Sequence, residues 1–121
     1  MGRRGRILLV DDQALTRSPV EIYLRRQGFE PVVCKNGKEA LAAAADCPPA
    51  CILMDLAMPG MDGLEATRQL RAAEATRDIP IIVVTSHPEP HAARAAGATD
   101  FLLKGTYTLQ ELTERIERLV S

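Results

Sequence analysis

Four short apolar runs are spaced along the chain, and each has the length of a buried strand. They occupy residues 7–10, 51–54, 81–84 and 101–103. Each run is followed by a stretch with helical features, and strands that alternate with helices predict a parallel sheet of repeated βα units. A more polar segment at residues 30–34 is typical of a shorter strand near the edge of the sheet. The pattern therefore predicts an α/β fold.

The first predicted helix contains a proline. It covers residues 14–27, and Pro19 lies inside it. A proline removes one backbone donor and crowds the preceding turn. The sequence therefore predicts either a bent first turn or a later start, with Ser18 as the capping residue.

Four further helices follow. Asn36 is suited to cap an alanine-rich helix that runs to residue 45, the third helix covers residues 64–75, and the last covers residues 108–120. Prolines at positions 88 and 90 disfavour regular helix at the start of the fourth segment. We therefore expect a shortened fourth helix that begins near His91 and ends before Gly97.

Strand order follows from the connections and from the charged residues. Right-handed crossovers and a polar edge strand favour a doubly wound, flavodoxin-like sheet of five parallel strands in the order 2-1-3-4-5. Asp11 and Asp12 follow the first strand and Asp55 follows the third, so this order makes them neighbours. Thr85 and Lys104 follow the fourth and fifth strands. All five side chains should meet at the carboxyl edge, where open α/β sheets bind ligands.

Three clustered carboxylates repel one another unless a cation relieves them. Oxygen ligands at an open site favour Mg²⁺, with Mn²⁺ as a substitute. A metal held in this way can also bind a phosphoryl oxygen, while Lys104 and the hydroxyl of Thr85 hold two others. The central carboxylate, Asp55, is then the natural nucleophile toward phosphorus.

Composition narrows the class of protein further. The 121 residues suit one domain, spanning 1–121, and a formal net charge of -1 gives no reason to expect direct nucleic-acid or membrane binding. The first apolar run is too short for a signal peptide or a membrane span, so we expect a cytoplasmic protein. Cys34, Cys47 and Cys51 show no paired metal-ligand spacing and are expected to be free thiols in the core.

Four segments together resemble the receiver domain of two-component response regulators, over nearly the whole chain. They are Asp11-Asp12, residues 55–63, Thr85-Ser86 and residues 97–104. An acidic pair alone is weak evidence, but the four segments occur in order and at suitable spacing. The resemblance implies a phosphorylation-controlled signalling module that is no enzyme beyond its own phosphoryl transfer and autodephosphorylation.

The resemblance also implies a role for each site residue. Asp55 would be the phosphoacceptor, and Asp12 and Asp55 would bind Mg²⁺ directly together with the backbone carbonyl of Ala57. Asp11 would reach the metal through water.

Two further residues would change conformation between the inactive and the phosphorylated state. Thr85 would bond the phosphoryl group in the active state, and Phe101 would change rotamer with it. The implied donor is a phosphohistidine on a sensor histidine kinase or a histidine phosphotransfer protein. Output would require a downstream protein partner or an output domain that these residues do not contain.

The chain departs from the family pattern in two places. Gly105 follows Lys104 where the family usually has a proline after a cis peptide bond. Because a cis bond before a residue other than proline costs roughly 2.5–4 kcal/mol, we expect a trans peptide and a reshaped loop. The segment between Thr85 and Lys104 is also shorter than the family norm by roughly one helical turn.

These departures keep alternatives open. A pseudo-receiver that binds a partner without phosphoryl transfer is favoured by Gly105 and the short fourth helix, and opposed by the complete acidic triad and Lys104. A phosphatase of the haloacid-dehalogenase type would need a second carboxylate two residues after Asp55, where Ala57 stands. Nucleotide binding is disfavoured because no glycine-rich loop follows the first strand.

Overall fold

The computed structural model describes residues 4–56, 63–86 and 90–120. In these residues five parallel strands form one sheet in the order β2-β1-β3-β4-β5, which confirms the predicted doubly wound fold. Strands and helices alternate along the chain as β1 (Arg6–Val10), α1 (Ala14–Arg26), β2 (Glu30–Cys34), α2 (Gly37–Asp46), β3 (Cys51–Asp55), α3 (Gly63–Ala72), β4 (Ile81–Thr85), α4 (Pro90–Ala96), β5 (Asp100–Leu103) and α5 (Leu109–Val120).

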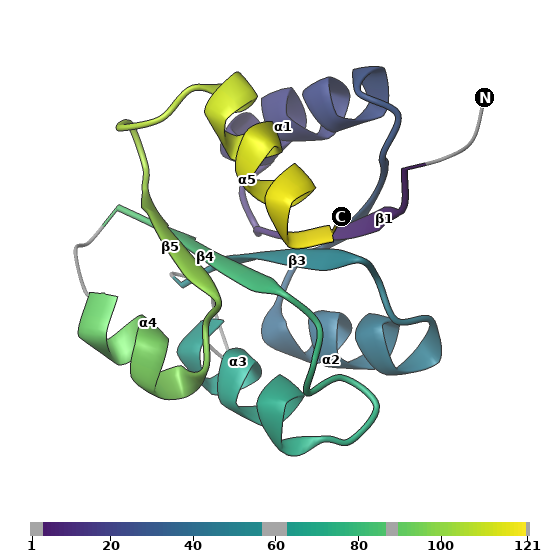
Figure 1. Cartoon of the computed structure of the whole chain (residues 1–121), viewed down its shortest axis with the longest axis vertical. Coiled ribbons are helices and arrows are strands. Elements are labelled where there is room, and N and C mark those ends of the chain that lie inside the picture. Colours follow the sequence, from purple (N-terminus) through teal and green to yellow (C-terminus); the bar gives the residue numbers. More distant parts are fainter. Residues whose placement is uncertain (1–3, 57–62, 87–89, 121) are drawn as a thin grey trace.

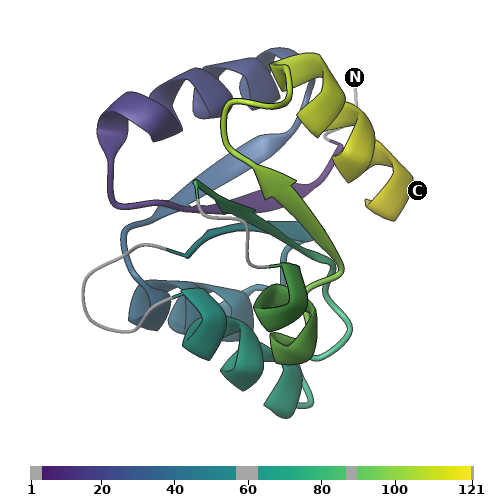
Figure 2. The same ribbon diagram turned by 90° about the vertical axis from the view of Figure 1, so that its left-hand side faces the viewer.

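Helices cover both faces of the sheet. Helices α1 and α5 lie on one face, and α2, α3 and α4 lie on the other (Figures 1 and 2). Successive strand residues point to opposite faces, so Ile7 and Leu9 join the core beneath α1 and α5, whereas Leu8 and Val10 join the other core. Burial on both faces explains why the strands are continuous apolar runs.

Helix α1 begins at Ala14, as in the predicted range 14–27, so the alternative of a later start with Ser18 as cap is wrong. The amide of Arg17 donates to the carbonyl of Gln13 at 3.0 Å, which closes a first turn before Pro19 is reached. Pro19 therefore lies inside the helix, and it is exposed.

Two helices are capped by side chains. The side chain of Asn36 accepts a hydrogen bond from the amide of Glu39 at 2.9 Å, as predicted for α2. Helix α5 begins one residue later than expected, because Thr108 is its cap. The hydroxyl of Thr108 accepts from the amide of Glu111, whose carboxylate in turn accepts from the amide of Thr108, both at 3.1 Å.

The fourth helix is short, as predicted, but the expected end of the third helix is wrong. Helix α4 spans seven residues, Pro90–Ala96, and Gly97 follows with a φ of 108°. Helix α3 ends at Ala72 and not at residue 75. The hydroxyl of Thr76 donates to the carbonyl of Leu70 at 2.6 Å and holds the chain in a turn there.

Two smaller expectations need correction. Strand β2 lies at the sheet edge, but its five residues equal the length of β1, β3 and β4, and the four-residue β5 is the shortest strand. Cys34 and Cys51 are buried free thiols as predicted, whereas Cys47 is exposed. Cys47 follows the last residue of α2 and belongs to no strand, so its side chain faces solvent.

Candidate functional site

The strand ends bring together the side chains that the sequence singled out. Asp55 and Thr85 are the last residues of β3 and β4, Asp11 follows β1, and Lys104 follows β5. In the sheet register Asp55 is the partner of Val84, so Thr85 lies one residue farther along the neighbouring strand. All four residues therefore occupy one edge of the sheet.

Asp11, Asp12 and Asp55 form an acidic cluster. One carboxylate oxygen from each lies within 4.8 Å of the other two, and Asp11 and Asp55 are only 7% and 5% exposed. Among the described residues, Oδ1 of Asp12 is buried and has no hydrogen-bond partner. A buried carboxylate oxygen without a donor is costly. An oxygen-binding divalent cation would satisfy this atom and relieve the repulsion, so the donor set fits Mg²⁺.

Asp11, by contrast, has a donor on each oxygen. The amide of Gln13 donates to Oδ1 at 2.9 Å, and the hydroxyl of Thr16 donates to Oδ2 at 2.7 Å. The guanidinium of Arg17 donates to the backbone carbonyl of Asp11 at 3.0 Å. The first turn of α1 thereby holds both the side chain and the backbone of Asp11.

Lys104 reaches into the cluster from β5. Its Nζ lies 3.2 Å from Oδ2 of Asp55, and its backbone amide donates to the carbonyl of Thr85 at 2.7 Å. The next peptide bond is trans, as predicted, and Gly105 has a φ of 85°, a conformation that favours glycine. The glycine thus allows the loop after Lys104 to turn without a cis peptide bond, and the ammonium stays beside Asp55.

Helix α3 approaches the site closely through Gly63. A Cβ at this position would lie 2.2 Å from the backbone oxygen of Asp55, which no side chain can tolerate. The glycine therefore lets the start of α3 pack directly beneath the end of β3.

The remaining predicted residues lie at different depths. Thr85 is 1% exposed at the end of β4. Phe101 is half-buried on β5 and packs against the core cluster that includes Ala93 of α4. Ala57, the expected source of a backbone ligand, lies outside the described residues.

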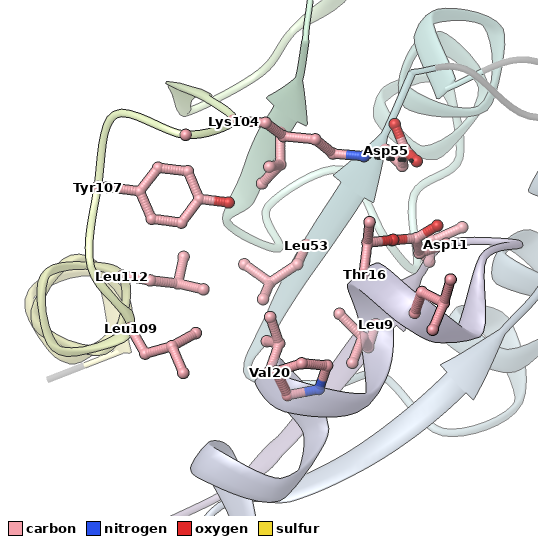
Figure 3. A pocket seen from close by; sticks show the side chains of 15 residues that line it. Leu9, Asp11, Thr16, Val20, Leu53, Asp55, Lys104, Tyr107, Leu109 and Leu112 are labelled. Carbon is pink, nitrogen blue, oxygen red and sulfur yellow. Dashed lines mark hydrogen bonds and ion pairs between the residues drawn. The ribbon is translucent and has the colours of Figure 1, made fainter.

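A cavity of about 340 Å³ opens between α1 and α5 next to the carboxylates (Figure 3). Aliphatic side chains such as Leu53 and Leu112 line most of it, and Asp11, Asp55 and Lys104 lie at its polar end. The ring of Tyr107 faces this space from the loop after Lys104. Burial raises the pKa of the Tyr107 phenol, and the negative charges of Asp55 and Asp11 raise it further.

Two residues of this site were not identified from the sequence. Thr16 and Tyr107 line the cavity but belong to no motif. The available signal was positional: Thr16 lies in the first helical turn after the acidic pair, and Tyr107 lies three residues after Lys104. Recognising either residue requires the true start of α1 and the path of the Gly105 loop.

The sheet order and the acidic cluster at the carboxyl edge are together typical of one protein family. The family model for the response regulator receiver domain matches residues 7–117. The chain therefore belongs to the receiver domain family of two-component response regulators, and the predicted resemblance is confirmed.

Curated relatives extend well beyond the matching region. The chain is 39% identical over 117 residues to the regulatory protein AtoC of Escherichia coli, covering 94% of this chain and 25% of AtoC. It is 37% identical over 119 residues to the transcriptional regulatory protein ResD of Bacillus subtilis, covering 95% of this chain and 48% of ResD. The chain thus spans a quarter to a half of the length of these two relatives.

Solved structures agree with the fold. The receiver domain of the sensor histidine kinase PA1611 from Pseudomonas aeruginosa has a TM-score of 0.89 and 32% identity, with 99% of this chain and 98% of that chain covered. That structure has a magnesium ion coordinated in its active-site cleft. The chemotaxis response regulator CheY4 of Vibrio cholerae has a TM-score of 0.87 and 29% identity, with coverages of 98% and 99%.

None of the helices in the described ranges combines the length and apolarity that a bilayer crossing requires.

Proposed function

We propose that this receiver domain accepts a phosphoryl group on Asp55 in a Mg²⁺-dependent reaction and thereby switches a partner-binding surface. One observation carries the proposal: oxygens of Asp11, Asp12 and Asp55 lie within 4.8 Å of one another, and the ammonium of Lys104 lies 3.2 Å from Asp55. Three carboxylates beside one ammonium suit a divalent cation and a doubly charged phosphoryl group together.

Asp12 and Asp55 would hold the metal directly, with Asp11 acting through water and the carbonyl of Ala57 as a further ligand. Oδ1 of Asp12, which is buried and has no hydrogen-bond partner in the described part of the chain, supports this assignment. Mg²⁺ would neutralise the carboxylates and polarise a phosphoryl oxygen, and Mn²⁺ would substitute for it.

In the transfer step a carboxylate oxygen of Asp55 attacks phosphorus. The new bond joins this oxygen to phosphorus while the bond between phosphorus and the donor's imidazole nitrogen breaks, and the nitrogen keeps the electron pair. Lys104, already paired with Asp55, would bind an oxygen of the transferred group, and the hydroxyl of Thr85 would bind another.

The switch would follow from that last contact. Thr85 lies at the end of β4, and Phe101 lies on the adjacent β5, half-buried against the cluster that includes Ala93 of α4. Movement of Thr85 toward the phosphoryl group would free space for the Phe101 ring to turn inward. The signal would then appear on the surface formed by α4, β5 and α5.

The remaining assignments concern context. We propose a cytoplasmic domain spanning residues 1–121, with its three free cysteines consistent with a reducing compartment. Its donor would be a sensor histidine kinase or a histidine phosphotransfer protein, and its target a protein partner or an output domain, with no direct contact to nucleic acid or membrane. Its only catalysis would be its own phosphoryl transfer and dephosphorylation.

The decisive test is incubation with acetyl phosphate and Mg²⁺, followed by intact mass measurement. We expect the wild type to gain the mass of one phosphoryl group and Asp55→Asn to gain none. Asp46→Asn, which changes an exposed carboxylate at the end of α2, is the matched control and should be labelled normally. A labelled Asp55→Asn, or an unlabelled wild type, would favour the pseudo-receiver alternative.

A further inference from the structure

Adjacent aspartates in the acidic cluster differ in how their oxygens are satisfied. Oδ1 of Asp12 is buried without a hydrogen-bond partner among the described residues. Each oxygen of Asp11 instead accepts one hydrogen bond, from the amide of Gln13 at 2.9 Å and from the hydroxyl of Thr16 at 2.7 Å. One of the three carboxylates is therefore held in place before any cation binds.

The Thr16 hydroxyl is the donor on which this orientation depends. It carries one hydrogen and has two acceptors in reach, Oδ2 of Asp11 at 2.7 Å and the carbonyl of Gln13 at 3.1 Å. The bond to the carboxylate is shorter and charge-assisted, so it is the stronger of the two. The backbone amide of Gln13 alone would fix one oxygen and leave the carboxylate free to rotate.

The start of α1 places this hydroxyl beside Asp11. Because the helix begins at Ala14, Thr16 belongs to its first turn, directly after the loop that carries both aspartates. An aliphatic residue of the same shape would keep the turn but offer Oδ2 no donor. An ionised carboxylate has about four acceptor sites, so Asp11 still has capacity for a metal-bound water.

We propose that Thr16 is a positioning residue for the metal site: its hydroxyl orients Asp11 so that the cluster binds Mg²⁺ with less reorganisation. This inference rests on the proposed function, because it assumes that the cluster binds Mg²⁺. Groups that orient direct metal ligands typically contribute 10–100-fold to metal affinity or activity. Because Asp11 would act on the metal through water, we expect the lower end of this range, so loss of this donor should weaken Mg²⁺ binding by about 10-fold.

The test is isothermal titration of the whole chain with MgCl₂, without any phosphoryl donor. We expect the Kd for Mg²⁺ to rise about 10-fold in Thr16→Val, which keeps the shape of the side chain, and to return toward wild type in Thr16→Ser, which restores the hydroxyl. Thr16→Ala removes the same donor with a smaller side chain and serves if the valine variant folds poorly.

Thr113→Val is the matched control. Thr113 is a buried threonine of α5 whose hydroxyl donates to the carbonyl of Leu109 at 2.9 Å. We expect it to lower the melting temperature while the Kd for Mg²⁺ is unchanged. If the role of Thr16 were purely structural, Thr16→Val would likewise lower the melting temperature and leave the Kd for Mg²⁺ unchanged.

The outcomes separate the two proposals. If the wild type binds Mg²⁺ and Asp12→Ala does not, but Thr16→Val binds as tightly as wild type, the role of Thr16 is overturned and the metal site stands. If the wild type shows no saturable binding, or Asp12→Ala binds equally well, the metal site itself is overturned, and the role of Thr16 with it.

Discussion

The ammonium of Lys104 lies 3.2 Å from Oδ2 of Asp55, although their strands are not neighbours in the sheet. β4 lies between β3 and β5, so this ion pair crosses the carboxyl end of β4. The Lys104 side chain is 25% exposed and that of Asp55 is 6% exposed. The pair is therefore shielded enough to contribute to stability.

Lys104→Met should destabilise the metal-free protein. It keeps the length of the side chain but leaves Asp55 with two other carboxylates and no ammonium. We expect the free energy of unfolding to fall by about 1.5–3 kcal/mol, the usual contribution of a hydrogen bond to a charged group. Urea unfolding in the presence of EDTA measures this. Lys104→Arg keeps the charge and should lose less; a methionine variant as stable as wild type would contradict the prediction.

Mg²⁺ should raise the melting temperature, because it binds the folded cluster and not the unfolded chain. Asp12→Ala removes the carboxylate whose buried Oδ1 has no partner within residues 4–56, 63–86 and 90–120, and it should abolish most of this increment. Thermal unfolding with and without millimolar MgCl₂ compares the two proteins. An equal response of both would place the metal elsewhere.

Alkaline pH should destabilise the fold through its buried thiols. Burial raises the pKa of Cys51 from 9.0 to about 12, and burial together with the charge of Glu39 raises that of Cys34 to about 11. Above about pH 9 the unfolded thiols lose their protons while the folded ones keep them, so stability is present below that pH and is lost as pH rises through these values.

The expected loss is up to about 1.4 kcal/mol per thiol per pH unit. Urea unfolding at about pH 8 and about pH 10 measures the slope, and Cys51→Ala should reduce it. Cys47→Ser, at an exposed thiol, should leave the slope unchanged. The prediction is wrong if the cysteine at position 51 has no effect on the slope.

The acidic cluster and Lys104 could be predicted from the sequence because a parallel sheet brings every strand end to one edge. Once the strands were located, their last residues had to meet. The order of the strands followed from the same charges and from the polar edge strand. The acidic cluster, the position of Lys104 and the strand order depend on where the strands lie in the sequence, and they depend little on how individual side chains pack.

The contacts that support the cluster could not be predicted in this way. Thr16 meets Asp11 only because α1 begins at Ala14, and the proline at position 19 had left a later start open as an alternative. The early end of α3 depends on the bond from Thr76 to a carbonyl six residues back. Such contacts are set by tertiary geometry, which periodicity does not encode.

Arg71 should contribute more to stability than any exposed arginine of α3. Its guanidinium donates to the carbonyls of Gly97 at 2.7 Å, Ile79 at 2.6 Å and Arg77 at 2.9 Å, and so ties α3 to the turns before β4 and β5. Arg71→Met removes all these donors, and we expect the free energy of unfolding to fall by about 2–3 kcal/mol.

Urea unfolding again provides the measurement. Arg71→Lys keeps the charge but not the planar fork, so it should recover only part of the loss. Arg68→Met is the control, because Arg68 is exposed and pairs with Glu65 of the same helix, and it should change stability by less than about 0.5 kcal/mol. Equal effects at positions 68 and 71 would contradict the argument.

Beryllofluoride, a phosphoryl mimic, should slow amide exchange on the α4, β5 and α5 surface when Mg²⁺ is present. The slowing should be moderate, because α4 has only seven residues and Gly105 loosens the following loop, so the two states differ little in free energy. Exchange measured by mass spectrometry over residues 90–120 tests this, with Asp55→Asn as the control that should not respond. No change in the wild type would favour the pseudo-receiver, and a full transition from unprotected to protected would show that the unphosphorylated state is entirely off.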